Sequence, residues 1–295
     1  MRPAFLGLGA IGRPMAARVA ESFPNLTVWN RTASRAQEFA AASKVRAAAT
    51  PAEAARDADV VITCFPTSHD VRALLDGPTG LLAGMREGST LVDCTSGDPA
   101  TSRAIAAILA ERKIGFIDAP VSGGVVGAEK GALTVMVGGD PAQLERVMPV
   151  LKSFGQKIVH CGDVGAGDAL KAVNNALLAI HIWSTAEGLV ALAKAGVDPK
   201  VALDVINVSS GRSNTSMNLF PERVLTRKFP RTFRLALLEK DIGIAAQVTR
   251  ENKVPAPVTQ MVADLFTMAR AELGEVADHV EVAKIVEEWG GAEIK

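Results

Sequence analysis

The sequence contains no tyrosine, and only three of its 295 residues are cysteines. The absence of tyrosine removes one common proton donor from the candidates for acid–base catalysis. Cys64, Cys94 and Cys161 are odd in number and lack metal-type spacing, so we expect reduced, structural thiols in a cytoplasmic protein. The four histidines show no metal-type spacing either. The sequence therefore predicts no metal site.

The sequence also lacks a net charge, because 32 basic residues balance 32 acidic ones. No block rich in lysine and arginine occurs, so we expect neither nucleic acid nor an anionic membrane surface as a partner. The apolar N-terminus contains glycines and prolines and lacks a cleavage site, which favours a buried strand and a turn over a signal peptide. We expect no membrane span, since no other apolar run approaches the required length.

Short apolar runs alternate with helical patterns in the first half of the chain. This alternation predicts an α/β fold with a mainly parallel sheet covered by helices on both faces. The expected strands are Ala4–Leu8, Thr27–Trp29, Val60–Thr63, Thr90–Asp93, Gly115–Asp118, Thr134–Val137 and Lys157–Val159. The expected helices are Ile11–Glu21, Ser34–Ala42, Pro51–Arg56, Val71–Leu75 and Pro99–Arg112.

After His160 the apolar residues recur at helical spacing, and no strand-like alternation returns. The helices expected in this half are Ala166–Ala195, Pro199–Val208, Phe233–Glu251 and Pro257–Leu273. The stretch Ala169–Ala193 is apolar on much of its circumference, which suits a helix buried in a domain core or a subunit interface. We therefore predict two domains, residues 1–163 and an all-helical domain of residues 164–295.

Gly7, Gly9 and Gly12 form a G-x-G-x-x-G pattern between an apolar strand and a helical pattern. The first glycine permits a tight turn, the second lets a pyrophosphate approach the backbone, and the third allows close packing of helix and strand. The start of the helix offers free N–H groups and the positive end of its dipole to phosphates. We therefore predict a dinucleotide site formed by Gly7, Leu8, Gly9, Ala10, Ile11 and Gly12.

The end of the second expected strand carries Asn30, Arg31 and Thr32, where an NAD site usually has Asp or Glu. A guanidinium can bind the 2′-phosphate of NADP through charge-assisted hydrogen bonds, whereas a carboxylate would repel it. We therefore expect a preference for NADP over NAD. The alternative is that Arg31 is an ordinary solvated residue and that either cofactor is accepted.

Lys171 and Asn175 stand four residues apart in a helical pattern, so they share one face of a helix. Near the start of that helix, the dipole and a cationic nicotinamide would both favour the neutral amine. A neutral amine can accept the proton of a hydroxyl, and an amide can orient the same group without titrating. Taken alone, the spacing fits equally a solvated surface lysine.

Four segments together resemble the β-hydroxyacid dehydrogenase family, most closely the 3-hydroxyisobutyrate dehydrogenases. They are Gly7–Ala16, Asp118–Gly139, Gly165–Asn175 and Lys240–Ala245. The resemblance implies a Rossmann-like domain followed by an all-helical domain, an active site in the cleft between them, and a homodimer or homotetramer. It implies reversible hydride transfer between NADP or NAD and a short 3-hydroxy acid or its semialdehyde.

The resemblance also implies roles for individual residues. Lys171 would transfer the proton, and Asn175 would be its neighbour on the substrate. The turn formed by Ser122, Gly123 and Gly124 would bind the substrate carboxylate. The residues that would border the cofactor are Phe65, Pro66, Ser96 and Lys240. Two positions depart from the family pattern. Ile11 stands where the family usually has methionine, which conserves the side-chain volume, and Ser96 stands where it usually has threonine, which conserves the hydroxyl group.

Some of these assignments have independent support and some have alternatives. Ser-Gly-Gly after a strand can expose consecutive N–H groups to a carboxylate, although a glycine turn can also serve packing alone. Lys240 and Asp241 can pair with each other, and Asp241 is not assigned to the catalytic set. The polar segment Val208–Asn218 is expected to be a loop that either helps to close the pocket or is simply solvated.

Three other activities fit the same patterns less well. One is reduction of tartronate, glyoxylic or succinic semialdehydes. Only the residues that line the substrate pocket would distinguish these compounds from 3-hydroxyisobutyrate. Another is imine reduction, but imine reductases of this architecture replace Lys171 with a different proton donor. The last is a cofactor-binding protein without catalysis, against which the intact set of Lys171, Asn175 and Ser122 argues.

Overall fold

The structure is a computed structural model that describes every residue from Met1 to Lys295. Its contacts divide the chain into two compact units, Met1–Lys171 and Ala172–Lys295. The division falls inside helix α9 (Ala166–Lys194), so this helix begins in the first unit and ends in the second. The boundary expected after residue 163 lies just before the same helix.

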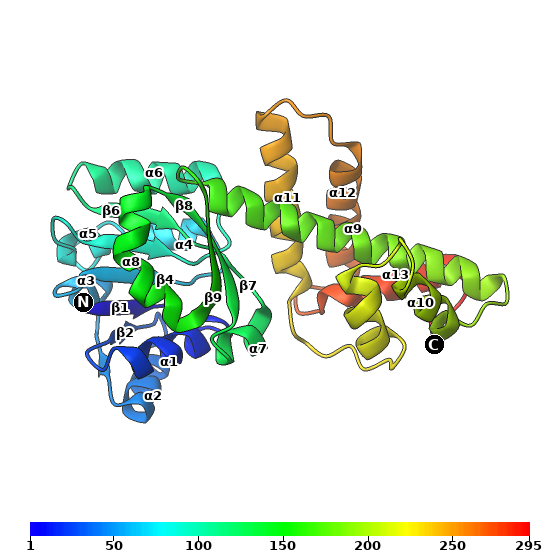
Figure 1. Cartoon of the computed structure of the whole chain (residues 1–295), viewed down its shortest axis with the longest axis horizontal. Helices are drawn as coiled ribbons and strands as arrows, with labels where there is room; N and C mark the ends of the chain where they lie inside the picture. The colour runs from blue at the N-terminus through cyan, green and yellow to red at the C-terminus, as the bar shows by residue number, and fades with distance from the viewer. The chain divides into compact units, whose positions relative to one another are not determined.

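The first unit contains a nine-stranded sheet (Figure 1). Its parallel part has the order β3-β2-β1-β4-β5-β6, in which the order reverses between β1 and β4. These strands are β1 (Pro3–Leu6), β2 (Thr27–Trp29), β3 (Arg46–Ala47), β4 (Val60–Thr63), β5 (Thr90–Asp93) and β6 (Gly115–Asp118). Such a reversal opens a crevice at the carboxyl ends of the strands, where doubly wound sheets bind ligands.

The remaining strands extend the sheet beyond β6. Strand β8 (Leu133–Gly139) is antiparallel to β6, and the short β7 (Val121–Ser122) is antiparallel to β8. Strand β9 (Gly155–Gly162) then runs parallel to β8. The predicted α/β fold with a mainly parallel sheet is therefore confirmed.

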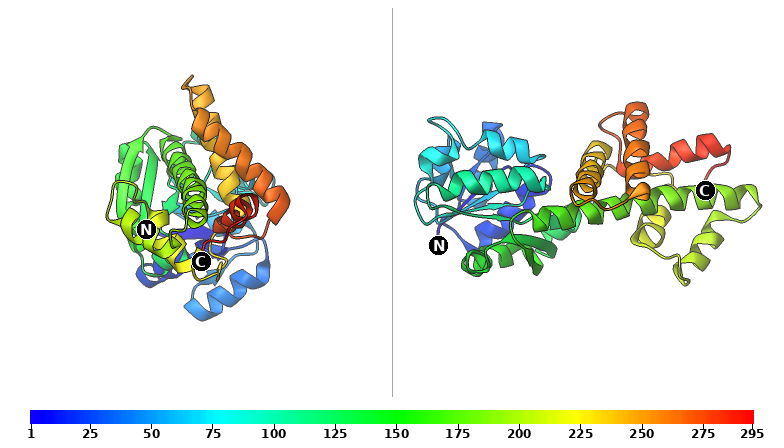
Figure 2. Two further views of the ribbon diagram at one scale, coloured as in Figure 1. Left: turned by 90° about the vertical axis from the view of Figure 1, so that its right-hand side faces the viewer. Right: turned by 90° about the horizontal axis from the view of Figure 1, so that it is seen from above.

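Alternate side chains of the central strands enter different apolar clusters, as expected for a sheet covered on both faces. In β1, Phe5 belongs to one cluster, whereas Ala4 and Leu6 belong to the other. The helices of the first cluster are α1 (Gly12–Ser22), α2 (Ala33–Ser43), α7 (Gly124–Glu129) and α8 (Pro141–Phe154). Those of the second are α3 (Pro51–Ala55), α4 (Ser68–Ala73), α5 (Leu81–Gly84) and α6 (Pro99–Ala110). Figure 2 shows these helices on the two sides of the sheet.

The second unit is helical and is built around the long helix α9 (Figure 1). Its other elements are α10 (Pro199–Asn207), the π-helix η1 (Thr215–Val224), α11 (Leu235–Glu251), α12 (Pro257–Leu273), the 3₁₀-helix η2 (His279–Glu281) and α13 (Val282–Gly290). Trp183 of α9 is the aromatic centre of the core, with its ring 6.1 Å from Phe266 and 5.8 Å from Trp289. The predicted all-helical second domain is confirmed.

Helix α9 contradicts the expectation that no apolar run approaches the length of a membrane span. By length and composition alone it could cross a membrane, because its most apolar window has a mean hydropathy of 1.5. In the structure, one of its faces supplies Ala179, Ile182 and Ala186 to the core of the second unit. Another face leaves Val173 and Leu177 exposed. A helix apolar on two faces passes the composition test while serving as the core helix of a domain.

The segment Val208–Asn218 differs from the expected loop, because its last four residues already belong to π-helix η1. Just before this helix, the hydroxyl of Ser213 accepts a 3.1 Å hydrogen bond from the backbone N–H of Ser216. Further along, Leu219, Phe220 and Val224 are buried in the core. Packing of these three residues therefore extends regular structure into a polar sequence.

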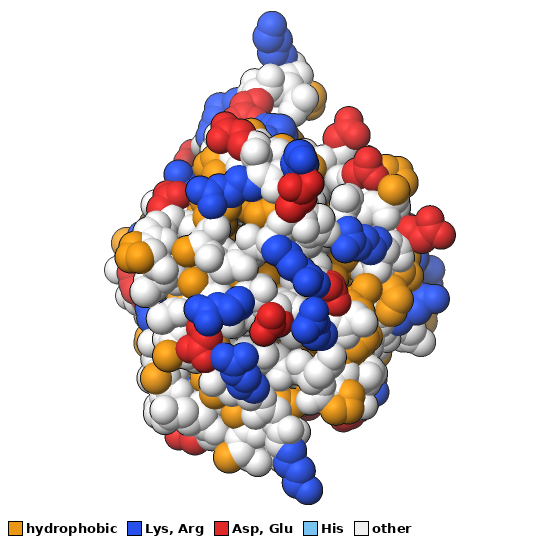
Figure 3. Space-filling view, turned by 90° about the vertical axis from the view of Figure 1, so that its left-hand side faces the viewer, with side chains coloured by type: hydrophobic (Ala, Val, Ile, Leu, Met, Phe, Trp, Pro, Cys, Tyr) orange, Lys and Arg blue, Asp and Glu red, His pale blue; other side chains and the backbone are white.

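Charged side chains of both signs are interspersed on the surface (Figure 3). Several form ion pairs within the first unit, including Lys113 with Glu87 and Arg46 with Glu53. Exposed pairs of this kind contribute about 0–1 kcal/mol each, so they do not hold the fold together.

Candidate functional site

The glycine turn after β1 has the geometry that a dinucleotide site requires. Gly7 has a φ of +101°, and a Cβ added there would overlap the carbonyl oxygen of Cys64. A Cβ on Gly12 would overlap the carbonyl oxygen of Gly7, whereas one on Gly9 would meet no atom within 4 Å. Packing thus demands the first and third glycines, and the second leaves open space above the backbone. A pyrophosphate fits that space at the start of α1, which no side chain caps.

Asn30 joins the end of β2 to this turn. Its side-chain oxygen accepts a 2.9 Å hydrogen bond from the backbone N–H of Leu8, and its Nδ2 donates to the carbonyl of Thr32. The neighbouring Arg31 has an 82% exposed side chain, and its Nη1 lies 3.6 Å from Asp70 Oδ1. Arg31 therefore directly follows a residue that hydrogen-bonds to the glycine turn, and its guanidinium is solvated and lies near Asp70.

The loops after β4 and β5 are bound to each other. The backbone N–H of Phe65 donates to Thr95 Oγ1 at 3.0 Å, and that of Asp98 donates to Ser68 Oγ at 2.7 Å. A Cβ on Gly7 would lie 3.4 Å from the ring of Phe65, so this loop also borders the glycine turn. Phe65, Pro66 and Ser96 are thus brought to the same edge of the sheet as Gly7.

Ser122 ends β7, and the two glycines that follow adopt positive φ values of +135° and +64°. Consecutive residues in this region of conformational space favour glycine at both positions. Gly123 and Gly124 are exposed, and a Cβ on Gly124 would meet no atom within 4 Å. The turn therefore leaves its backbone accessible to a small ligand.

Lys171 and Asn175 lie one turn apart on α9, and both are buried, with exposed fractions of 8% and 3%. Asn175 Nδ2 donates a 2.6 Å hydrogen bond to Asp241 Oδ2 of helix α11. Lys240 Nζ lies 2.9 Å from the other oxygen of the same carboxylate. Asp241 is itself buried and so holds two of the predicted site residues together.

Asp241, which the sequence analysis did not assign to the site, contacts two of the predicted site residues. The adjacent Lys240 offered a partner in the sequence, and the structure confirms that the two side chains pair. The contact with Asn175 joins residues 66 positions apart, so it could not be read from spacing. The contacts described above thus bring predicted site residues together in one group around the glycine turn and another around Asp241, and they connect the Ser122–Gly124 turn to neither.

The cysteines take no part in these groups. All three are free, and burial raises the pKa of Cys64 to about 12 and that of Cys94 well above its ordinary value. Both thiols remain protonated at neutral pH and pack as small apolar groups. No group of three or more His, Cys, Asp or Glu side chains is arranged to hold a metal ion.

Two protein families match the chain, one for each half. The NAD binding domain of 6-phosphogluconate dehydrogenase matches residues 2–162. The family described as NAD-binding of NADP-dependent 3-hydroxyisobutyrate dehydrogenase matches residues 165–286.

Individual relatives match almost the whole chain. It is 36% identical over 291 residues to 2-(hydroxymethyl)glutarate dehydrogenase of Eubacterium barkeri, covering 98% of this chain and 96% of that protein. It is 35% identical over 276 residues to 3-hydroxyisobutyrate dehydrogenase of Pseudomonas aeruginosa, covering 90% and 91% of the two chains. A structure of Mycobacterium tuberculosis 3-hydroxyisobutyrate dehydrogenase with L-serine is similar, with a TM-score of 0.88, 32% identity, and coverage of 97% of this chain and 99% of that one.

The glycine turn generates a paired prediction. Gly9→Ala should leave the melting temperature unchanged but weaken NADPH binding by at least about 10-fold, because the new methyl group occupies the space left for the pyrophosphate. Gly12→Ala should lower the melting temperature, because its Cβ overlaps the carbonyl of Gly7. Thermal melts and fluorescence titration with NADPH measure both effects. Unchanged NADPH affinity in the Gly9 variant would place the phosphates elsewhere.

Proposed function

The chain belongs to the NAD(P)-dependent 3-hydroxyacid dehydrogenases, and we propose that it interconverts 3-hydroxyisobutyrate and its semialdehyde with NADP(H) as the preferred cofactor. The observation that carries the proposal is a buried lysine, Lys171, one helical turn before an asparagine that a buried carboxylate holds in place. A lysine whose surroundings exclude water is suited to exchange a proton with a substrate hydroxyl.

Each site residue has one task in this proposal. The nicotinamide, when bound, supplies or accepts the hydride. In the oxidation direction, Lys171 Nζ takes the proton of the substrate hydroxyl, and in reduction it returns that proton to the oxygen. Asp241 fixes the amide plane of Asn175, which thereby contacts the substrate in one orientation. The backbone N–H groups of the Ser122–Gly124 turn bind the substrate carboxylate.

The cofactor contacts also follow from the arrangement at the sheet edge. The turn Gly7–Gly12 binds the pyrophosphate, and Arg31 binds the 2′-phosphate of NADP. Phe65, Pro66 and Ser96 border the nicotinamide half, because they follow the carboxyl ends of β4, which pairs with β1, and of β5, which pairs with β4. Lys240, whose side chain pairs with Asp241 in the second unit, is proposed as a further cofactor contact from the family resemblance.

The substrate is tested with a panel of short 3-hydroxy acids. We expect kcat/KM to be highest for 3-hydroxyisobutyrate, with overlapping activity on L-serine, glycerate and 2-(hydroxymethyl)glutarate, because one methylene changes selectivity only about 10- to 200-fold. Tartronate, glyoxylic and succinic semialdehydes are included in the reducing direction. A higher kcat/KM for one of these would change the substrate but not the reaction. Tight NADPH binding without any turnover would favour a non-catalytic protein.

Lys171→Ala should lower kcat by about 10²- to 10⁴-fold, the usual range for loss of a general acid–base group. The NADPH dissociation constant should change little, because Lys171 acts on the substrate oxygen. Lys194→Ala, at the exposed end of the same helix, is the matched control and should retain wild-type kcat. Full turnover by the Lys171 variant would exclude this residue as the proton-transfer group.

Arg31→Asp should lower the ratio of kcat/KM for NADP to that for NAD by at least about 10-fold, because a carboxylate repels the 2′-phosphate that a guanidinium binds. Arg35→Asp, which changes an exposed arginine in helix α2, controls for the general loss of positive charge. A ratio that falls equally in both variants would show long-range attraction rather than a specific contact.

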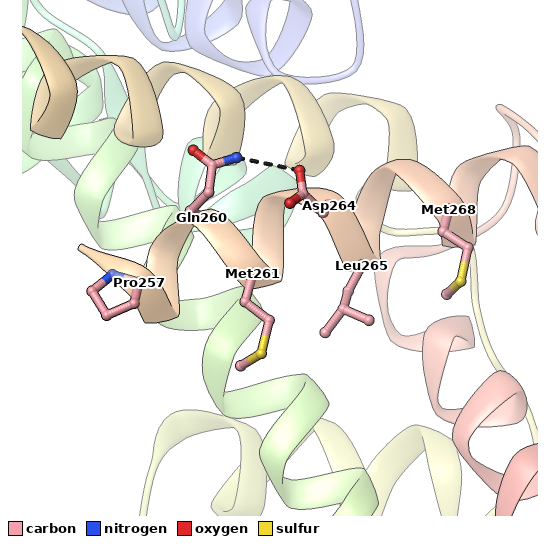
Figure 4. A pocket seen from close by; sticks show the side chains of 6 residues that line it. All are labelled: Pro257, Gln260, Met261, Asp264, Leu265 and Met268. Carbon is pink, nitrogen blue, oxygen red and sulfur yellow. Dashed lines mark hydrogen bonds between the residues drawn. The ribbon is translucent and has the colours of Figure 1, made fainter. Parts of the chain in front are cut away.

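We also propose that the protein is a homodimer or homotetramer formed through the second unit. Exposed apolar side chains support this, namely Val173 and Leu177 on α9 and Val258 and Met261 on α12. Figure 4 shows Met261, Leu265 and Met268 pointing to one side of α12, where they line a shallow hollow. Side chains of this kind are enriched in the buried centre of subunit interfaces.

Met261→Lys should shift the assembly toward the monomer in sedimentation velocity, because it places a charge among apolar contacts. Thr267→Lys, at an exposed position of α12 that does not line this hollow, is the control and should leave the assembly intact. A wild-type protein that sediments as a monomer throughout the micromolar range would refute the oligomer.

A further inference from the structure

Two buried carboxylates hold the first turn of α9 against the sheet. Asp118, at the end of β6, is fully buried. Its Oδ1 accepts a 2.7 Å hydrogen bond from the backbone N–H of Gly165, and its Oδ2 accepts one of 3.0 Å from that of Asp168. The first turn of a helix has N–H groups without partners inside the helix. Asp118 therefore supplies from the sheet the acceptor that an N-cap residue normally provides.

Asp168 extends this connection to the loop after β5. Its exposed fraction is 1%, and its Oδ1 accepts a 3.1 Å hydrogen bond from the backbone N–H of Gly97. Its Oδ2 accepts a 2.6 Å hydrogen bond from the hydroxyl of Ser102. Gly97 directly follows Ser96, and Asp168 lies three residues before Lys171. One side chain thus joins the loop that borders the cofactor to the helical turn that precedes the reactive amine.

The space around the two carboxylates is closed by glycines. A Cβ on Gly167 would lie 2.9 Å from Asp118 Oδ2, and a Cβ on Gly138 would lie 2.5 Å from Asp118 Oδ1. A Cβ on Gly97 would lie 3.1 Å from both oxygens of Asp168. The backbone therefore approaches both carboxylates closely, and a side chain at any of these three positions would have to displace a neighbouring group.

The electrostatics agree with a role in holding structure. Burial raises the pKa of Asp118. Burial and the nearby charge of Asp118 together raise the pKa of Asp168 well above its ordinary value. Two carboxylates in one buried site resist carrying two charges. A neutral amide at position 168 should therefore replace the carboxyl group with little loss.

We propose that Asp168 is a positioning residue, which sets Lys171 in register with the cofactor through its hydrogen bonds to Gly97 and Ser102. The inference rests on the proposed function, because it concerns the placement of the proton-transfer lysine. Asp168 is buried, and its side-chain oxygens accept hydrogen bonds from Gly97 and Ser102, so we assign it an indirect role. A shift of about 1 Å at the reacting atoms can lower a rate by about 10²-fold, so such an anchor has a measurable effect.

Three variants test the proposal. Asp168→Ala removes both hydrogen bonds and should lower kcat by about 10- to 100-fold, with NADPH bound about 10-fold more weakly because the Ser96–Gly97 loop is released. Asp168→Asn retains an acceptor for Gly97 and gains a donor for Ser102, so both values should stay within about 3-fold of wild type. Ser102→Ala removes one hydrogen bond and leaves the other, and should lower the melting temperature without comparable loss of kcat.

A merely structural role predicts a different result. In that case Asp168→Ala would lower the melting temperature, while kcat and NADPH affinity of the folded enzyme would match wild type, and the proposal would be overturned. An Asn variant as impaired as the Ala variant would also overturn it, because charge and not hydrogen bonding would then matter. If the Ala variant does not fold, Gly97→Ala separates the same loop from Asp168, and wild-type kcat and affinity in that variant would decide against the proposal.

The two proposals fail in distinguishable ways. If wild-type protein oxidises none of the hydroxy acids, the proposed function fails. NADPH affinity still decides the inference in that case, because it does not depend on turnover. Wild-type affinity in a folded Asp168→Ala protein would then refute the positioning role.

Discussion

The hydrogen bonds of Asp118 join the sheet of the first unit to the helix that carries Lys171. A parallel sheet ends in loops, and loops alone hold a side chain less precisely than a packed helix does. The Asp118 carboxylate accepts hydrogen bonds from two backbone N–H groups at the start of α9 and so fixes this end of the helix to the sheet. This contact therefore also fixes the backbone position of Lys171, which lies about one turn further along α9. The same helix continues into the core of the second unit.

Close backbone approach is the second constraint on this site. The glycine turn after β1 lies against the carbonyl of Cys64, and the glycines around Asp118 and Asp168 lie against carboxylate oxygens. In both places a methyl group would have no room. Gly9 differs because its surroundings are open, as a ligand-binding position requires. Glycine therefore serves two opposite purposes at the same sheet edge, dense packing and ligand access.

Hydrophobic periodicity was sufficient for most of the fold. The strands of the parallel sheet and the long helices α9 and α12 fall close to their expected bounds, because each buries a face with a regular spacing. Elements without an expected counterpart include the strands β3 and β7, which contain only two residues each, and the 14-residue helix α8. The π-helix η1 was missed because its polar residues indicate a loop, and only packing of Leu219 and Phe220 into the core stabilises it.

The sequence by itself determined the class of this protein, because strand and helix periods, the glycine pattern and the order of the family segments are all local properties of the chain. The partners of buried polar groups were decided only by the tertiary structure. Asn175 with Asp241, and Asp168 with Gly97, pair residues 66 and 71 positions apart. The physical reason is that a buried carboxylate needs hydrogen-bond donors, and the fold can supply them from residues far away in the sequence. The spacing of residues along the chain does not show which of them will meet.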